Sequence, residues 1–247
     1  MKTVKNVVAI GGGELSLNET LAIDKFIVEL ANKKNPQALF IPTASGEPDG
    51  YFETFNQVYG TKLCCSTDVL KIITEAPTDA GIREKILSAD IVYVGGGNTV
   101  KMMEAWQNRN IGVYLKEAYN RGTILTGMSA GSICWFEYGY SDSFMDETGI
   151  CGVVKGLGIL PNLNCPHYNE RPEFDKFMAS QKIPALAIEN NCAVVFQNDT
   201  YKVIKSVDSA NAYLIVTDNG VVKKNVINNA VFMPIKGLFR TAYACGR

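Results

Sequence analysis

The sequence predicts an α/β protein of three layers, with a mostly parallel, doubly wound sheet and an antiparallel, hairpin-rich C-terminal extension. Two observations lead to this fold class. In the first half of the chain, short runs of β-branched residues alternate with segments of helical periodicity, the pattern of βαβ units and a parallel sheet. Beyond about residue 197 the helical segments stop, and short strands are separated by turn sequences such as Asp218-Asn219-Gly220.

A single domain over 1–247 accounts for the chain, with a core over about 5–197 and antiparallel strands over about 198–235. Hydrophobic residues make up 47% of the sequence, which is enough to bury a sizeable core. The 24 Lys and Arg nearly balance the 25 Asp and Glu. This balance argues against nucleic acid as a general partner, because such binders need a strong basic surface.

Processing signals are not evident in the sequence. No segment has the pattern of a signal peptide or the length of a membrane span, so we expect a cytoplasmic protein without a membrane partner. The seven cysteines form no C-x-x-C pair, and they fit small core residues in a reducing compartment better than disulfides or a zinc site. We therefore expect neither a metal nor another cofactor.

The expected elements follow in chain order. Strands in the first half are expected at 5–10, 37–41, 68–73, 91–94 and 123–126. The helices between and after them are expected at 20–33, 51–60, 80–88, 99–108 and 111–120. Strand-like runs follow at 156–161 and 185–188, and the C-terminal strands are expected at 193–196, 201–205, 212–216 and 221–227.

Small and polar residues follow three of the parallel strands. These loops are T-A-S-G at 43–46, G-G-G-N-T at 95–99 and G-M-S-A-G at 127–131. In an open α/β sheet, ligands bind in the crevice outside the carboxyl ends of the strands. The three loops therefore predict the position of a binding site.

Ser129 is the candidate nucleophile, because G-M-S-A-G matches G-x-S-x-G between a strand and a helix. Small neighbours permit the strained turn that this position requires. The N–H of Ala130 is then one donor for an oxyanion, and Gly97 or Asn98 is a candidate for the second. A tight turn with a serine at the helix N-cap explains the same five residues without catalysis.

His167 is the only histidine, so a serine nucleophile would have this imidazole as its base. A single histidine also excludes any site in one chain that needs two histidines. An isolated histidine is often a plain core or surface residue, but His167 follows Ser129 by 38 positions with acids between them. The order along the chain is then serine, acid, histidine.

The acid of such a triad has several candidates. Asp142 lies in a turn of small residues 13 positions after Ser129, where a carboxylate can be held rigidly, and it is our first choice. The competing acids are Glu137, Asp146, Glu147 and Glu189.

Four motifs together resemble the dipeptidase E (alpha-aspartyl dipeptidase) and cyanophycinase family of serine peptidases. They are I-P-T-A-S at 41–45, V-G-G-G-N-T at 94–99, G-M-S-A-G at 127–131 and P-H-Y at 166–168. The resemblance covers about residues 5–197. It implies a class I glutamine amidotransferase-like fold in which serine replaces the cysteine nucleophile, and hydrolysis of small peptides.

The resemblance also implies roles for individual residues. Ser129 matches the family's nucleophile, His167 its general base, and Gly97 and Ala130 its oxyanion-hole positions. The acid of the family varies in type and spacing, so Asp142 is the best match and Glu147 remains open.

An aspartyl substrate needs a cation for its β-carboxylate. Arg171, four residues after His167, is the candidate, although an arginine at the start of a surface helix explains it as well. Glu189 is a candidate for a substrate amine or for support of His167, with a surface salt bridge as the alternative. Asn98 is a further candidate for substrate binding.

Other function classes fit less well. An α/β-hydrolase esterase places more sheet strands between serine and histidine, and a dinucleotide-binding protein needs the full G-x-G-x-x-G, which ends at Ser16 here. A binding protein with the same fold and no useful catalysis stays open. An exposed hairpin edge near the C-terminus would allow a homodimer.

Overall fold

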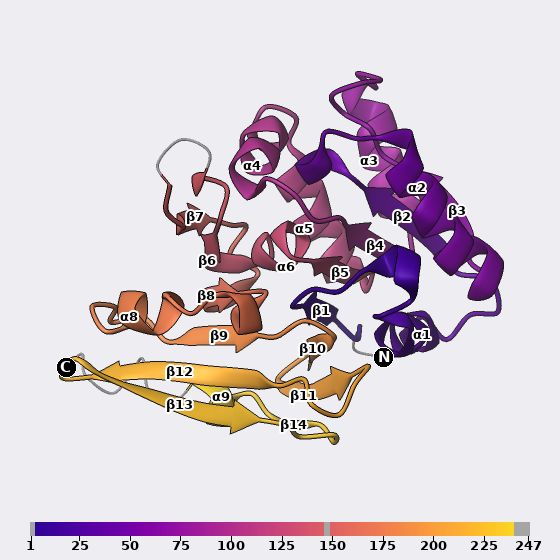
Figure 1. Ribbon diagram of the computed structural model, residues 1–247. Coiled ribbons are helices and arrows are strands. Elements are labelled where there is room, and N and C mark those ends of the chain that lie inside the picture. Colours follow the sequence, from indigo (N-terminus) through magenta and orange to yellow (C-terminus); the bar gives the residue numbers. More distant parts are fainter. Residues whose placement is uncertain (1–2, 146–148, 240–247) are drawn as a thin grey trace.

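The computed structural model describes residues 3–145 and 149–239. The fold is α/β and contains two sheets (Figure 1). Strand order in the larger sheet is β14 (Met233–Pro234), β11 (Thr200–Lys205), β10 (Cys192–Gln197), β1 (Asn6–Ile10), β5 (Ile124–Met128), β4 (Ile91–Val94), β2 (Gln37–Ile41) and β3 (Ser66–Val69). The five strands from β1 to β3 in this order run parallel, which confirms the mostly parallel core.

Helices cover the larger sheet on both faces, because the strands bury alternate side chains on opposite sides. On one face lie α3 (Asp79–Ser88), α4 (Thr99–Gln107) and α5 (Ile111–Arg121). On the other lie α1 (Leu21–Leu30), α2 (Asp49–Phe55) and a π-helical turn, η3 (Asn56–Lys62). In β1, for example, Val7 belongs to the first core cluster and Val8 to the second.

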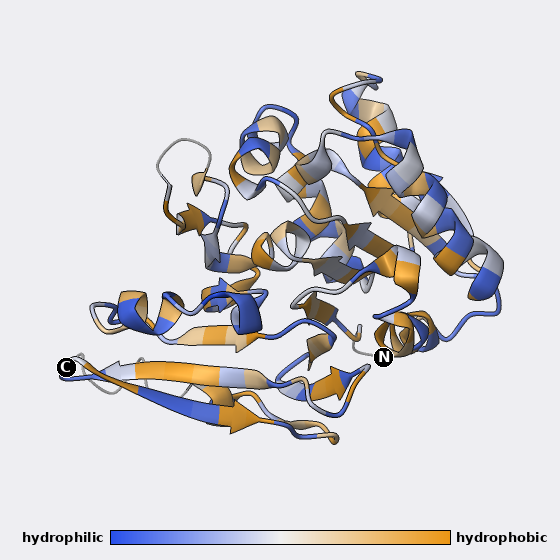
Figure 2. Cartoon of the chain, in the orientation of Figure 1, coloured by the Kyte–Doolittle hydropathy of each residue, from blue (hydrophilic) through white to orange (hydrophobic). Residues whose placement is uncertain are grey.

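A second, smaller sheet extends the molecule. Its strand order is β13 (Val221–Ile227), β12 (Ala212–Asp218), β9 (Ala185–Ile188), β8 (Leu160–Cys165), β6 (Phe136–Ser141) and β7 (Gly152–Lys155). The short helices α6 (Ala130–Ile133), α8 (Phe174–Met178) and α9 (Lys236–Phe239) complete the fold with the 3₁₀ turns η1 (Leu15–Leu17), η2 (Thr43–Ser45) and η4 (Tyr168–Glu170). Figure 2 shows hydrophobic strands inside and hydrophilic residues on the outer helix surfaces.

The C-terminal strands are antiparallel, as expected, but they are divided between the two sheets. β10 pairs with β1 and β11 continues the larger sheet, whereas β12 pairs with β9 in the smaller one. Each hairpin thereby covers the backbone of a strand that would otherwise be an open edge.

The third strand differs from its expected bounds. It spans Ser66–Val69 instead of 68–73, because the buried Glu47 carboxylate binds the backbone beyond it. The N–H groups of Ile72 and Ile73 donate to this carboxylate at 2.7 to 3.1 Å, so they do not need a sheet partner.

Within 3–145 and 149–239, no helix is long and apolar enough to cross a bilayer. No group of three or more His, Cys, Asp or Glu in these ranges is placed to hold a metal ion.

Candidate functional site

Ser129 lies at the turn between β5 and α6 in a backbone conformation that non-glycine residues rarely adopt, with φ 57° and ψ −114°. Its glycine neighbours allow the turn to pack tightly. A Cβ on Gly131 would lie 2.0 Å from the carbonyl oxygen of Val94, and one on Gly127 would lie 2.5 Å from that of Gly131. The strained, small-residue turn expected from the sequence is therefore present at the carboxyl end of β5.

The end of β1 anchors both Ser129 and His167. The Ser129 N–H donates to the carbonyl oxygen of Ile10 at 3.2 Å, and the His167 N–H donates to that of Gly11 at 3.0 Å. These consecutive carbonyls bring the two residues, 38 positions apart in sequence, to the same strand end. No hydrogen bond within the described residues joins the Ser129 hydroxyl to the imidazole.

Asn190 faces the imidazole from the loop between β9 and β10. Its side-chain oxygen lies 2.7 Å from Nδ1 of His167, and its amide nitrogen donates to the Glu170 carboxylate at 2.5 Å. A carboxylate only accepts, so Glu170 sets the orientation of the amide and leaves the amide oxygen toward the ring. In the neutral imidazole this contact places the proton on Nδ1, whose N–H donates to the amide oxygen, and leaves the lone pair of Nε2 to accept a proton.

Gly12 packs directly against the His167–Asn190 pair. A Cβ at position 12 would lie 2.1 Å from the side-chain oxygen of Asn190 and 2.4 Å from Nδ1 of His167. Only glycine therefore fits beside the His167–Asn190 pair as it stands.

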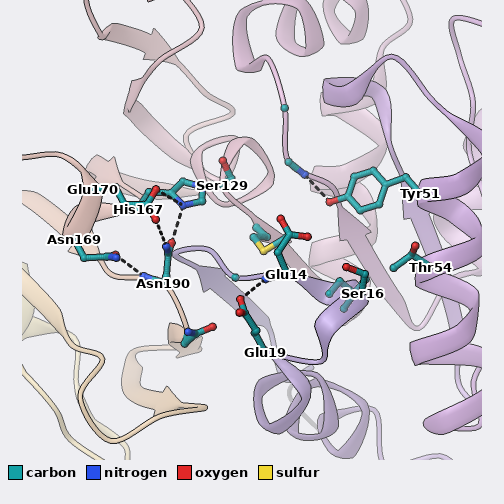
Figure 3. A pocket seen from close by; sticks show the side chains of 16 residues that line it. Glu14, Ser16, Glu19, Tyr51, Thr54, Ser129, His167, Asn169, Glu170 and Asn190 are labelled. Atoms are coloured by element: carbon teal, nitrogen blue, oxygen red, sulfur yellow. Dashed lines mark hydrogen bonds and ion pairs between the residues drawn. The ribbon is translucent and has the colours of Figure 1, made fainter.

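A cavity of about 710 Å³ contains these groups (Figure 3). The described residues that line it are Gly13, Glu14, Leu15, Ser16, Glu19, Tyr51, Thr54, Gly96, Gly97, Met128, Ser129, His167, Asn169, Glu170, Asn190 and Asn191. Ser129 and His167 lie on one side of Glu14 and Tyr51 on the other (Figure 3).

Backbone donors are available close to the serine. A Cβ on Gly96 would lie 3.3 Å from Cβ of Ser129, so the glycine loop after β4 passes directly beside it. Tyr51 holds this loop, because its hydroxyl accepts the Gly96 N–H at 3.1 Å. The N–H groups of Gly97 and Ala130 have no hydrogen-bond partner among the residues that the structure describes. Gly97 lines the cavity, whereas Ala130 is buried behind it.

Among the described residues, no hydrogen bond joins Asp142, our first choice of acid, to the imidazole. Its carboxylate accepts a hydrogen bond from the Arg171 guanidinium at 2.7 Å. Burial alone would lower the pKa of Arg171, but the bond and charge of Asp142 raise it overall. Glu147, the alternative acid, and Asp146 lie outside the described residues. Glu137, another of the competing acids, accepts the backbone N–H of Asn162.

The three residues suggested for substrate binding do not line this cavity, and each contacts another part of the protein. Arg171 pairs with Asp142 beside a separate hollow. Asn98 caps α4 by accepting the Lys101 N–H at 3.0 Å. The carboxylate of Glu189 accepts hydrogen bonds from the N–H of Asn211 and the hydroxyl of Tyr213, and so holds the segment that leads into β12.

Comparison with known proteins identifies the family. The family model described as Peptidase family S51 matches residues 7–204, most of the chain.

This chain belongs to Peptidase family S51.

Two relatives of the chain are named as peptidases. The uncharacterized peptidase YgaJ of Bacillus subtilis (strain 168) is 31% identical over 220 residues, covering 86% of this chain and 93% of the relative. The uncharacterized peptidase PM1590 of Pasteurella multocida (strain Pm70) is 25% identical over 194 residues, covering 74% of this chain and 91% of the relative. Membership in family S51 and these relatives support a peptidase.

A solved structure supports the fold independently. A peptidase from an acI-B1 Actinobacterium superposes with a TM-score of 0.73 at 18% identity, covering 94% of this chain and 98% of that one. At this identity the likeness concerns the fold alone. It includes the second sheet of the S51 chain, since the coverage reaches nearly the whole molecule.

Proposed function

We propose that the protein is a serine peptidase that hydrolyses small peptides through an acyl-enzyme, with Ser129 as nucleophile and His167 as general base. The observation that carries this proposal is the shared anchoring of both residues on the end of β1, with Nδ1 of His167 occupied by Asn190. This arrangement leaves Nε2 as the proton acceptor, which is the tautomer that a serine nucleophile requires.

The proposed reaction proceeds in two steps. Ser129 Oγ attacks the peptide carbonyl while Nε2 of His167 takes its proton, and the imidazolium then protonates the leaving amine. Water, deprotonated by the same nitrogen, attacks the acyl-enzyme and releases Ser129. The N–H groups of Gly97 and Ala130, which have no partner among the described residues, are the proposed donors to the oxyanion. The hydroxyl has to turn toward Nε2 as substrate binds, since catalytic hydrogen bonds often form only in the complex.

Asn190 takes the place of the triad acid in this proposal. An amide orients the imidazole without carrying charge, as in the Cys-His-Asn arrangement of papain-like proteases. A carboxylate is nevertheless close to the ring. That of Glu170, which holds the Asn190 amide, lies 3.9 Å from Nδ1 of His167. The proposed catalytic constellation is thus Ser129, His167 and Asn190, with Glu170 as a positioning residue.

Two other functions remain to be separated by experiment, namely an esterase or amidase activity and a binding protein without catalysis. The test is kcat/KM on a panel of dipeptides, longer peptides and simple esters. We expect peptide hydrolysis that falls by about 10³-fold or more in Ser129→Ala and in His167→Ala. Ser88→Ala, an exposed serine on α3, is the matched control and should retain full activity. Peptide hydrolysis that survives both active-site substitutions contradicts the proposal.

A further inference from the structure

The cavity around Ser129 is lined by three carboxylates, those of Glu14, Glu19 and Glu170. None of the described residues that line it is lysine or arginine. Apart from His167, the proposed general base, the lining therefore has no group that is ordinarily cationic. A substrate in this cavity meets a predominantly negative field.

Two of the three carboxylates already have hydrogen-bond partners. Glu19 accepts the backbone N–H of Glu14 at 2.8 Å, and Glu170 accepts the Asn190 amide. The carboxylate of Glu14 has no hydrogen bond or ion pair with any residue that the structure describes. It is also exposed to the cavity, between the Ser129 side and the Tyr51 side (Figure 3).

The charge of Glu14 acts close to the proposed reaction centre. Burial raises the pKa of the Tyr51 hydroxyl, the Gly96 N–H lowers it, and the charge of Glu14 raises it further. Tyr51 holds the glycine loop beside Ser129. Glu14 therefore lies close to the tyrosine that holds the glycine loop, and a cation bound to Glu14 would share one cavity with a peptide bond placed at Ser129.

We propose that the site takes substrates with a positive charge near the scissile bond, a protonated amine or a guanidinium, and that Glu14 is the specificity-determining residue that binds it. This inference rests on the proposed peptidase function. It replaces the aspartyl preference implied by the sequence resemblance, because Arg171 is paired with Asp142 and lies outside the cavity. An aspartyl side chain would meet carboxylates with no cation to compensate them.

The cation has two possible sources, the free N-terminal ammonium of the substrate or a lysine or arginine side chain. Both present N–H donors to a carboxylate. The test compares 7-amino-4-methylcoumarin amides of lysine, alanine and aspartate, each with a free and with an acetylated amino terminus. The acetyl-alanyl amide carries no charge and is the neutral reference.

We expect the wild-type protein to cleave a cation-bearing amide at least about tenfold better, by kcat/KM, than the neutral reference. Activity on alanyl amide that is lost on acetylation identifies the ammonium as the source. Activity on acetyl-lysyl amide identifies the side chain. A neutral or acetyl-aspartyl amide that is cleaved as well as the cationic ones overturns the inference and leaves the peptidase function intact.

The assignment to Glu14 is tested with Glu14→Gln. The ratio of kcat/KM for the cationic amide to that for the neutral reference should fall by about tenfold, since one charge-assisted contact is removed. Glu84→Gln makes the same change in net charge at an exposed site on α3 and should retain the wild-type ratio. An unchanged ratio in Glu14→Gln overturns the assignment.

A binding measurement separates this inference from the proposed function. If no amide is cleaved and Ser129 does not react with a fluorophosphonate, the peptidase proposal fails. Titration calorimetry of Ser129→Ala with Lys-Ala, acetyl-Ala-Ala and acetyl-Asp-Ala still decides the charge preference. Tighter binding of Lys-Ala supports the inference, and equal or tighter binding of the other two overturns it.

Discussion

The amide of Asn190 stands where a serine triad commonly has a carboxylate. Its orientation depends on Glu170, because the carboxylate accepts only from the amide nitrogen and so turns the amide oxygen to the ring. The imidazole is held in the required tautomer by a neutral residue. Asp142, the acid first chosen from the sequence, is bonded to Arg171.

Replacing Asn190 should reduce catalysis while leaving the fold intact. We expect Asn190→Ala to lower kcat by about 10²- to 10⁴-fold through loss of tautomer control, with KM changed far less. The control is Asp142→Asn, whose kcat should stay within about threefold of wild type. Asp142 is half-exposed and pairs with Arg171, not with the imidazole. A larger loss of kcat in Asp142→Asn than in Asn190→Ala would instead identify Asp142 as the third member of the triad.

A methyl group at position 12 should disturb the same pair. Gly12→Ala places a Cβ against both the amide oxygen and the imidazole, so at least one of them has to move. We expect kcat/KM to fall by about 10²-fold, the cost of a small misplacement of a catalytic group. Gly50→Ala is the control, because a Cβ there meets no atom within 4 Å and α2 gains a better helix former. Equal activity of the two variants would contradict the geometry.

The residues of the candidate site differ in how far the sequence points to them. Ser129 and His167 were proposed from the sequence because a glycine-flanked serine and a single histidine are rare signals. Asn190 was not, since an asparagine beside another asparagine at a strand end reads as an ordinary turn. Its role depends on β9 ending next to β1, a contact between segments about 180 positions apart that no local pattern encodes.

Among the elements, the first-half strands β1, β2, β4 and β5 agree with the expected pattern because each is a largely apolar run buried on both faces, whereas β3 is polar and partly exposed. The second sheet was not recognised as a sheet. Its strands β6 and β8 carry polar residues such as Asn162 and Asn164, and β6 is interrupted by a register shift. Periodicity cannot identify strands whose polar side chains are satisfied by tertiary contacts, as Asn164 is by Ser132.

One element contact has a consequence for stability. Asp24 on α1 is fully buried and accepts hydrogen bonds from Thr20 at 2.9 Å and from the Tyr59 hydroxyl at 2.8 Å. Burial raises its pKa from 3.8 to about 6, although both hydrogen bonds oppose the shift. The folded protein thus binds this proton more tightly than the unfolded chain. The resulting stability is complete below about pH 4 and is lost as the pH rises through 6.

Asp24→Asn should remove this pH dependence. The amide keeps both contacts, since its oxygen accepts from Tyr59 and its nitrogen donates to the Thr20 hydroxyl. We expect the variant to be more stable than wild type at pH 8 by about 1–3 kcal/mol, with the difference shrinking toward pH 4. Urea unfolding at both pH values measures it. A variant that is less stable at pH 8 would show that the ionised carboxylate is well accommodated.

On the scale of the whole molecule, one hydrophobic core joins the two sheets. Its largest cluster contains Leu125 and Val194 from the larger sheet together with Leu186 and Leu214 from the smaller one. The expectation of a single domain remains a prediction, and this shared cluster supports it. The C-terminal strands take part in both sheets, so removing them would open both.

Unfolding should therefore occur in one cooperative transition. Trp106 and Trp135 are both buried in the shared cluster, so their fluorescence reports its loss, while far-ultraviolet circular dichroism reports the helices and strands. We expect the two signals to give the same denaturant midpoint. Midpoints that differ would show that the sheets unfold separately and would refute the single-domain prediction.

A homodimer through the C-terminal hairpin also stays a prediction. β13 is an edge of the smaller sheet, but it carries Lys223 and Lys224, and edge lysines disfavour pairing with a second strand. Sedimentation velocity gives the mass directly.

Activation of Ser129 by His167 is tested by the reaction of the protein with diisopropyl fluorophosphate, followed by intact-mass and peptide mass spectrometry. We expect one adduct, on Ser129, formed at least about 10²-fold more slowly in His167→Ala because the base is missing. Failure of Ser129 to react, or an equal rate in the His167→Ala variant, would contradict it.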